Sequence, residues 1–311
     1  MKYCPITYEV IHQNEDYSKD GLRLLSPRLK GLVPLAFSAA EQRAEAIAHA
    51  GKMSIQGVQS KLSAVLKISE ERFQIVDQKG AFILKPQSEH YPELPENEAI
   101  TMSLAEIIGI DVPVHGLVYS KDNSMTYFIR RFDRVGRGGK IAVEDFSQLS
   151  QHSRETKYNS SMEKVAAILQ KYCSFHKIEA VKLFKLVLFN FLIGNEDMHL
   201  KNFSLLSKEG KTTLAPAYDL LNTTIAQRNT KEELALPLNG KKNNLKRADF
   251  VDYYASEQLQ LNDKVIAAVL TEIKEAIPQW SELIKKSFLS SSMQEKYLDL
   301  LEQRAERLEL K

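Results

Sequence analysis

The chain has 311 residues, of which 43% are hydrophobic, and it carries 42 lysines and arginines against 40 aspartates and glutamates. This length and apolar content fit an ordinary globular protein of one large domain or two lobes. A formal net charge of +2 supplies no general field for nucleic acid or an anionic membrane, so neither is an expected direct partner. Two distant cysteines, Cys4 and Cys173, exclude a disulfide framework and a cysteine zinc site. The first ten residues lack a secretory signal, and we expect a cytoplasmic protein.

The first part of the chain predicts strands around one helix. Residues 1–50 contain turn formers, including Asp20-Gly21, and then an alanine-rich stretch from Ser38 that predicts a helix to about Ala50. The expected strands are 62–68, 73–76, 81–85, 112–118 and 125–132, the last two joined by a hairpin at 121–123. Between them, residues 95–108 have the apolar period and acidic first turn of an amphipathic helix.

After a glycine-rich connection at 136–139 the pattern becomes mostly helical to the end of the chain. We therefore predict an α+β fold of two lobes, a small strand-rich lobe over 1–135 and a larger helical lobe over 136–311, with a hinge near 132–140. Apolar residues at helical spacing after 245, and the lone Trp280, are expected to form core.

The candidate catalytic and metal-binding residues lie between positions 195 and 219. An apolar helix ends at Gly194 and runs into a polar loop, a predicted hairpin, and then Asp219. In phosphotransferases an aspartate of such a loop accepts the substrate hydroxyl proton, an asparagine five residues later binds Mg²⁺, and a second aspartate holds the metal that bridges the nucleotide phosphates. Asp197, Asn202 and Asp219 have this order and spacing.

Each of these residues taken alone is more often structural, because Asn and Asp favour turns. The combination indicates catalysis. His199 has no second histidine at ligand spacing, so we expect it to orient the loop rather than bind metal. Lys201 either neutralises charge on the transferring phosphoryl group or is a solvated loop lysine.

The phosphate side of such a site needs cationic and amide donors. Lys85 ends an apolar strand and could contact phosphates, and Glu98 in the following helix could pair with it. The segment around Ser54 and Gly57 is neither a Walker A loop nor the glycine-rich loop of ordinary protein kinases, because its glycine stands alone.

Several motifs, taken in order, resemble those of the HipA-type serine/threonine kinase toxins. They are Ser54-Ile55-Gln56-Gly57-Val58-Gln59-Ser60-Lys61, Phe82-Ile83-Leu84-Lys85-Pro86, Asn97-Glu98, Arg131-Phe132-Asp133-Arg134, Gly194-Asn195-Glu196-Asp197-Met198-His199-Leu200-Lys201-Asn202-Phe203-Ser204 and Ala215-Pro216-Ala217-Tyr218-Asp219. The likeness extends from about residue 50 to at least 239–241.

The resemblance implies a two-lobed, protein-kinase-like fold that uses ATP and Mg²⁺. It implies the following roles: Lys85 on the ATP phosphates, Phe132 near the adenine, Asp197 as the base, and Asn202 and Asp219 on Mg²⁺. It also implies that the Ser54 loop closes over the nucleotide and that Ser54 is autophosphorylated, with Ser60 a second candidate. A phosphate at Ser54 would oppose ATP binding by charge repulsion.

In two respects the chain departs from full-length members. The motifs begin near residue 50, about 100 residues earlier than in those members, which resembles HipT, the shortened toxin of the three-gene version. Arg130 stands where some relatives have glutamate, so a side-chain contact to adenine is not expected there. The implied partners are a HipS-like small protein, a HipB-like DNA-binding antitoxin and a protein substrate, for which aminoacyl-tRNA synthetases are family examples.

Two other functions remain open from the residues. A small-molecule kinase of the aminoglycoside or choline type shares the Asp-x₄-Asn loop, but there histidine precedes the aspartate, whereas His199 follows Asp197. A nucleotide-binding pseudokinase regulator would have no chemical need for Lys85, Asn202 and Asp219 together with that base.

Overall fold

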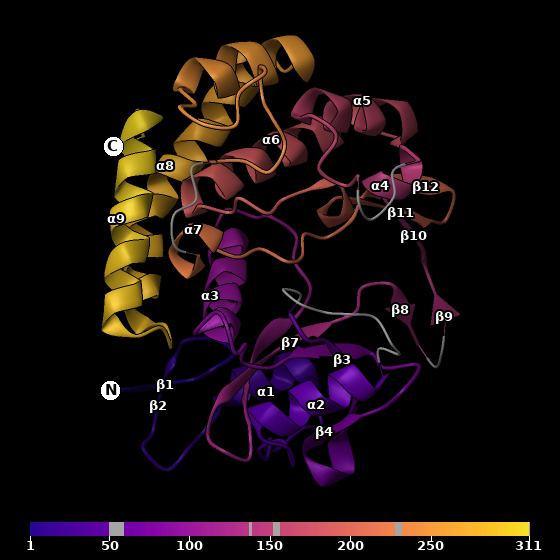
Figure 1. Cartoon of the computed structure of the whole chain (residues 1–311), viewed down its shortest axis with the longest axis vertical. Helices are drawn as coiled ribbons and strands as arrows, with labels where there is room; N and C mark the ends of the chain where they lie inside the picture. Colours follow the sequence, from indigo (N-terminus) through magenta and orange to yellow (C-terminus); the bar gives the residue numbers. More distant parts are fainter. Residues whose placement is uncertain (50–58, 137–138, 152–155, 228–231, 311) are drawn as a thin grey trace. The chain divides into compact units, whose positions relative to one another are not determined.

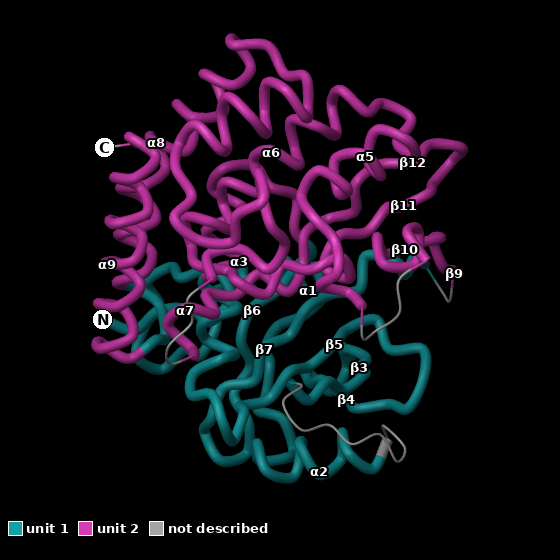
Figure 2. The backbone as a smooth tube through the Cα atoms, turned by 45° about the horizontal axis from the view of Figure 1, so that its top comes forward, with its two compact units in different colours: residues 1–100, 113–138, 286–289 teal, residues 101–112, 139–285, 290–311 magenta. Residues whose placement is uncertain are grey.

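The computed structural model describes residues 1–49, 59–136, 139–151, 156–227 and 232–310. Contacts within the chain divide it into two compact units, coloured separately in Figure 2. Unit 1 comprises residues 1–100, 113–138 and 286–289, and unit 2 comprises 101–112, 139–285 and 290–311. The division into lobes at residue 135 stays a prediction.

Unit 1 is built on a five-stranded antiparallel sheet with the order β4-β3-β5-β7-β6. Its strands are β3 (Leu62–Lys67), β4 (Arg72–Ile75), β5 (Phe82–Lys85), β6 (His115–Tyr119) and β7 (Met125–Arg130). These five strands confirm the strands expected from the sequence. Phe73, Phe82 and Phe128 pack together in the core beneath the sheet, with ring centroids 5.1 to 6.3 Å apart.

Two short strands and two helices complete the beginning of unit 1. They are β1 (Lys2–Tyr3), β2 (Val10–Ile11), α1 (Lys19–Leu25) and α2 (Ala39–His49). Helix α2 lies where the alanine-rich pattern predicted it. The expected turn at Asp20-Gly21 is wrong, because Ser18 caps α1 by accepting from the Gly21 amide at 2.9 Å and places both residues in the helix. Gly21 fits there because a Cβ would lie 2.9 Å from the Cys4 sulfur.

Unit 2 is mainly helical, as predicted, around a three-stranded antiparallel sheet of order β10-β11-β12. Its strands are β10 (Ala142–Asp145), β11 (Ser204–Lys208) and β12 (Lys211–Leu214). The hairpin β11–β12 was predicted, but β10 was missed, because its alternating short pattern gains a ladder only through distant β11. Two further short strands are β8 (Arg134–Val135), which belongs to unit 1, and β9 (Gly139–Lys140), which belongs to unit 2.

The remaining helices have the following bounds: η1 (Ile68–Glu70), α3 (Leu94–Ile107), α4 (Phe146–Leu149), α5 (Met162–Tyr172), α6 (His176–Ile193), η2 (Leu200–Asn202), α7 (Thr223–Ala226), η3 (Asp249–Gln258), α8 (Asp263–Lys286) and α9 (Ser291–Arg307). In Figure 1, α9 runs beside α8. Trp280 of α8 is fully buried and donates to the Leu104 carbonyl at 2.9 Å, which confirms its expected core role.

Helix α6 carries the apolar run that precedes the polar loop. Its last eleven residues, 183–193, are buried apart from Lys185, which is partly buried and reaches the Ile108 carbonyl at 2.7 Å. Of the described helices, none combines the length and apolar character needed to cross a membrane. The chain is therefore an α+β protein in which the buried end of α6 leads directly to the candidate site.

Candidate active site

The polar loop begins where Gly194 ends α6. Gly194 has φ +73°, and its amide donates to the carbonyls of Asn190 and Phe191. A Cβ here would lie 2.4 Å from Leu300, 2.7 Å from the Thr224 hydroxyl and 2.9 Å from the Asn222 amide oxygen. Glycine is thus required both by its backbone angle and by its neighbours, and it sets the direction in which the loop leaves the helix.

Buried asparagines connect α6 to Asp197. Asn190 donates to the Leu186 carbonyl at 2.8 Å, Asn195 donates to the Asn190 side chain at 2.7 Å, and the Asp197 amide donates to the Asn195 side chain at 3.2 Å. Both asparagines are 1% exposed. Buried amides favour one fully hydrogen-bonded arrangement. This series of hydrogen bonds therefore fixes the backbone that carries the Asp197 carboxylate.

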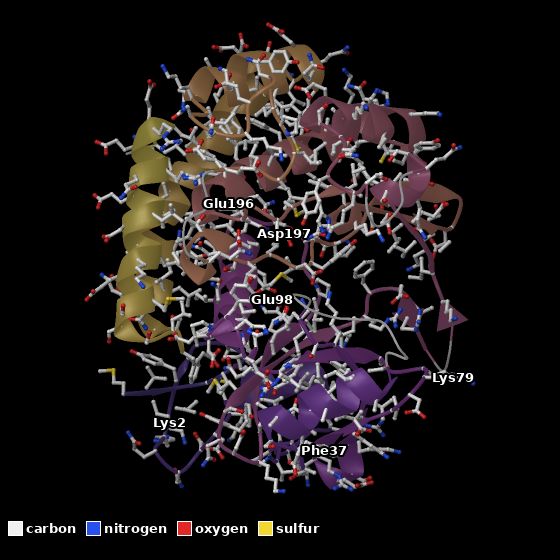
Figure 3. All side chains as sticks on the ribbon, viewed as in Figure 1. Lys2, Phe37, Lys79, Glu98, Glu196 and Asp197 are labelled. Atoms are coloured by element: carbon white, nitrogen blue, oxygen red, sulfur yellow. The ribbon has the colours of Figure 1, made fainter. Side chains whose placement is uncertain are left out.

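Glu196, the neighbour of Asp197, is held from α7 and α9. Its amide donates to Thr223 at 2.7 Å, and its carboxylate accepts from the Thr224 hydroxyl at 2.6 Å. Arg304 of α9 lies 3.7 Å from the same carboxylate and donates to the Phe191 carbonyl at 3.3 Å. Figure 3 labels Glu196 and Asp197 next to each other at the end of α6. The loop is therefore held on both sides of the candidate base.

The Asp197 carboxylate accepts a hydrogen bond of 2.5 Å from the phenol of Tyr158. Burial, and then this bond to the carboxylate, raises the pKa of Tyr158, so the phenol stays protonated at neutral pH. Beside the pair is a cavity of about 460 Å³ within unit 2. The cavity is lined by Tyr158, Glu196, Asp197, Thr223, Gln227, Glu232 and Lys242.

The backbone of His199 makes two hydrogen bonds within the loop, and the orienting role of this residue stays a prediction. Its amide donates to the Asp197 carbonyl at 2.8 Å, and its carbonyl accepts from the Asn202 amide at 2.9 Å. The ring nitrogen Nε2 lies 2.6 Å from the Lys157 ammonium, which can only donate, so Nε2 is the acceptor. Burial lowers the pKa of His199, against the opposing effects of Asp197 and Asp219. The neutral ring thus lies within the field of both carboxylates.

Asn202 and Lys201 lie in η2, and Asp219 follows β12. The Tyr218 phenol donates to the Lys201 carbonyl at 2.8 Å and lies 2.6 Å from the Ser204 hydroxyl, so it ties the loop to the segment carrying Asp219. Asp219 has φ +54°. Left-handed backbone is unusual outside glycine and often marks a functional position, although Asp tolerates it better than most residues.

The donor types suit Mg²⁺. Asp219 offers carboxylate oxygens and Asn202 an amide oxygen, which are hard ligands, and Mg²⁺ in phosphotransferases takes its remaining ligands from phosphate and water. Among the residues described, no three or more His, Cys, Asp and Glu side chains gather to hold a metal by themselves. A metal here would therefore depend on oxygens from a bound nucleotide as well as on these two residues.

The sequence-predicted residues of the strand-rich part lie in unit 1. The pairing of Lys85 with Glu98 is confirmed: the ammonium lies 2.5 Å from the carboxylate, and the side chains are 3% and 1% exposed. The Lys85 ammonium also lies 5.5 Å from the centre of the Tyr127 ring. Glu98 is labelled in Figure 3. An ion pair taken out of water is costly unless geometry and hydrogen bonds compensate it, so its presence suggests a role beyond stability.

A second buried carboxyl lies in the same helix. The Gln87 amide nitrogen donates to both carboxylate oxygens of Glu96, at 2.6 and 2.8 Å. Burial raises the pKa of Glu96 from 4.5 to about 7. This group therefore titrates near neutral pH, unlike an exposed glutamate.

Phe132 is partly buried in a turn after β7, and Ser60 lies just before β3. Ser54 and Gly57 fall outside the described residues. Arg130 turns toward α1, where its guanidinium donates to the carbonyls of Leu24 at 3.1 Å and Leu25 at 2.5 Å. Arg130 thus caps the carboxyl-terminal end of α1, and the expectation about adenine at this position stays a prediction.

The sequence carries no local signal for Lys157, for Tyr158 or for the contact of Arg304 with Glu196. These residues lie 40, 39 and 107 positions from Asp197 in the chain, and nothing in their local pattern distinguishes them. A lysine-tyrosine pair and a helix arginine are common surface features. Only their contacts in the fold bring them to the loop.

Comparison with known proteins places this geometry in a family. The model of the family described as HipA-like C-terminal domain matches residues 53–281. A putative kinase of Haemophilus influenzae is 29% identical over 96% of this chain and 94% of its own length. The serine/threonine-protein kinase toxin HipA of Shewanella oneidensis is 26% identical over 73% of this chain, which spans 56% of that protein.

The fold agrees with this assignment. The crystallised complex of Shewanella oneidensis HipA, HipB and operator DNA contains a chain that superposes with a TM-score of 0.71 at 23% identity, over 89% of this chain and 73% of that one. The two-lobed, kinase-like α+β class expected from the sequence is thereby confirmed. Because the matched segment covers most of the chain, the chain belongs to the family described as HipA-like C-terminal domain.

Proposed function

We propose that the chain is an ATP- and Mg²⁺-dependent serine/threonine protein kinase. The observation that carries this proposal is the buried ion pair of Lys85 and Glu98. Kinases need such a pair to hold a lysine for the nucleotide phosphates. A fold that needed only stability would be served as well by apolar side chains at these two positions.

The roles of the residues follow from the chemistry. Asp197 accepts the proton of the acceptor hydroxyl, and the Asn195 and Glu196 contacts keep its backbone in place. Mg²⁺, when held by Asn202 and Asp219, neutralises charge on the phosphates. His199 holds the loop, and Lys201 is placed on that loop to assist charge neutralisation.

The nucleotide side is assigned to unit 1. In this proposal Lys85 contacts the ATP phosphates while Glu98 keeps it in position, and Phe132 lies near the adenine. The loop with Ser54 and Gly57 covers the nucleotide, and Ser54, with Ser60 as second candidate, accepts a phosphate. The added charge would weaken ATP binding.

The biological role proposed is that of a cytoplasmic toxin kinase of the HipT type. Its support is the likeness to a serine/threonine-protein kinase toxin and to a HipA found with HipB and operator DNA. A HipB-like antitoxin, a HipS-like small protein and a protein substrate such as an aminoacyl-tRNA synthetase are the corresponding partners. No direct contact of this chain with nucleic acid or membrane is proposed.

The test is incubation of the whole chain with Mg²⁺ and γ-labelled ATP, alone and with a bacterial extract. We expect phosphoserine on the chain and a labelled protein band in the extract. Asp197→Asn keeps the shape of the side chain but removes the base, and it should slow transfer by about 10²- to 10⁴-fold. Asp219→Ala should abolish transfer through loss of the metal.

Glu295→Gln, an exposed change on α9, is the matched control and should retain activity. Full labelling by Asp197→Asn would contradict the assignment of the base. Labelling of small molecules alone would instead indicate a small-molecule kinase, and nucleotide binding without any transfer would indicate a pseudokinase.

A further inference from the structure

The hydroxyl that lies on the candidate base belongs to the chain itself. Tyr158 donates to Asp197 at 2.5 Å, within the reach at which a base removes a proton. An acceptor hydroxyl in a kinase must make this same contact. The phenol therefore occupies the position that an acceptor substrate needs.

Two neighbouring side chains hold the Tyr158 ring in place. The Tyr158 and His199 rings meet edge-to-face with centroids 5.0 Å apart, and the Lys157 ammonium lies 4.8 Å from the centre of the Tyr158 ring. Lys157 is itself held by His199 at 2.6 Å. A cation is thus fixed beside the phenol, where it can stabilise negative charge on an arriving phosphoryl group.

The surroundings also allow reaction. Tyr158 is 40% exposed and borders the 460 Å³ cavity, so a phosphate on its oxygen has space.

We propose that Tyr158 is a phosphoryl acceptor for the Asp197 of its own chain. The inference rests on the proposed kinase function. In the step, Asp197 takes the phenolic proton as the Tyr158 oxygen bonds to the γ-phosphorus of a nucleoside triphosphate. The bond from that phosphorus to the β,γ-bridging oxygen breaks, and the nucleoside diphosphate leaves with its electron pair.

The phosphorylated Tyr158 side chain would not stay in contact with Asp197. A phosphotyrosine carries about −1.5 to −2 charge at neutral pH, and Asp197 and Glu232 both line the same cavity. Repulsion displaces the modified side chain, and Asp197 becomes accessible to an external hydroxyl. Phosphorylation of Tyr158 thereby opens the acceptor position.

The test is site-resolved mass spectrometry of the whole chain after incubation with Mg²⁺ and ATP, with Tyr172 as internal control. Tyr172 is 37% exposed and has the preceding lysine 4.8 Å from its ring centre, as Tyr158 does. Among the described residues, Tyr158 donates to Asp197 and Tyr172 does not. We expect phosphate on Tyr158 and none on Tyr172. The signal should disappear in Tyr158→Phe and in Asp197→Asn and persist in Tyr172→Phe.

The intramolecular route has its own test. The modified fraction at a given time should not change over about a hundredfold range of protein concentration, as expected for a pre-positioned acceptor. When active Tyr158→Phe is mixed with inactive Asp197→Asn, the second chain should gain no phosphotyrosine. Gain of phosphotyrosine there would overturn the assignment to the same chain.

Different results would contradict the kinase proposal and the proposal about Tyr158. Phosphoserine with an unmodified Tyr158 overturns this inference and leaves the kinase proposal standing. Absence of both phosphoamino acids and of nucleoside diphosphate overturns the kinase proposal itself. Equal modification of Tyr158 and Tyr172 overturns the inference by showing that exposure alone selects the site.

Discussion

Two buried carboxyls in one helix behave differently because their neighbours differ. Glu98 has the Lys85 ammonium at 2.5 Å, which supports a charged pair away from water. Glu96, two residues earlier, accepts hydrogen bonds from the neutral Gln87 amide instead of from a charged group. Burial then favours the neutral acid, and the pKa of Glu96 rises to about 7.

This difference predicts how stability depends on pH. Between pH 4.5 and about 7 the folded chain retains a proton on Glu96 that the unfolded chain has released, so the free energy of unfolding falls as pH rises through this window. Glu96→Gln is neutral at every pH and should remove that loss. We expect the variant to be more stable than wild type at pH 8 by about 3 kcal/mol at most, and the gain to shrink toward pH 5.

Urea unfolding at several pH values measures this effect. Glu295→Gln, which removes an exposed negative charge, controls for the change in net charge. A stability difference that stays constant from pH 5 to 8 would show that Glu96 does not titrate in this window.

At the scale of elements, the end of α6 is the structural feature on which the candidate site depends. Asp197 lies three residues beyond Gly194, so the direction of the chain at Gly194 decides where the base lies. The Thr223 hydroxyl of α7 donates to the Gly194 carbonyl at 3.1 Å, and the Thr224 hydroxyl lies 3.0 Å from the same carbonyl. Arg304 of α9 donates to the Phe191 carbonyl. Three helices thus meet at one helix end.

Gly194→Ala should therefore disturb both stability and catalysis. Left-handed backbone costs an alanine about 1–2 kcal/mol, and overpacking against Leu300, Thr224 and Asn222 adds about 1–3 kcal/mol. Gly210→Ala is the matched control, because Gly210 has the same φ of +73° but nothing within 4 Å of an added Cβ. It should lose only the backbone contribution.

Thermal unfolding of both variants, with transfer activity measured below the transition, checks this prediction. Equal losses at the two glycines would show that packing at the end of α6 is not tight. Loss of activity by folded Gly194→Ala but not by Gly210→Ala would confirm that this turn positions the base.

At the scale of the whole molecule, unit 2 is assembled from distant segments of the chain. Residues 101–112 belong to it although 113–138 belong to unit 1. Thr101 of α3 and Tyr297 of α9 share a buried hydrogen bond of 2.9 Å across 196 positions. Contacts of this kind close long loops and are expected to form late in folding.

Tyr297→Phe should accelerate unfolding more than it slows folding, since a late contact is largely absent from the transition state. Loss of one partner of a buried hydrogen bond should cost about 1–3 kcal/mol. The double variant Tyr297→Phe with Thr101→Val should lose less than the sum of the single changes. Stopped-flow fluorescence of Trp280, the single tryptophan, follows unit 2 directly. A purely slower folding rate would place the contact early instead.

The sequence alone determined the local elements and the order of the motifs. Short apolar stretches define β3 and β5, the acidic first turn and apolar period define α3, and the apolar run with Gly194 defines the end of α6. These features depend on neighbours within a few residues. The Asp197, Asn202 and Asp219 spacing is likewise visible in the chain. The pairing of Lys85 with Glu98, 13 positions apart, was only a hypothesis from the sequence, and the structure decided it.

Only the tertiary structure decided what surrounds those residues. It brings Tyr158 to Asp197, Lys157 to His199, and Arg304 to the carboxylate of Glu196. Strand β10 likewise exists because β11, about 60 residues later, supplies its hydrogen-bond partners. Such contacts join positions far apart in the chain, and a linear pattern contains no physical signal for the side chain that will lie opposite until the core has packed.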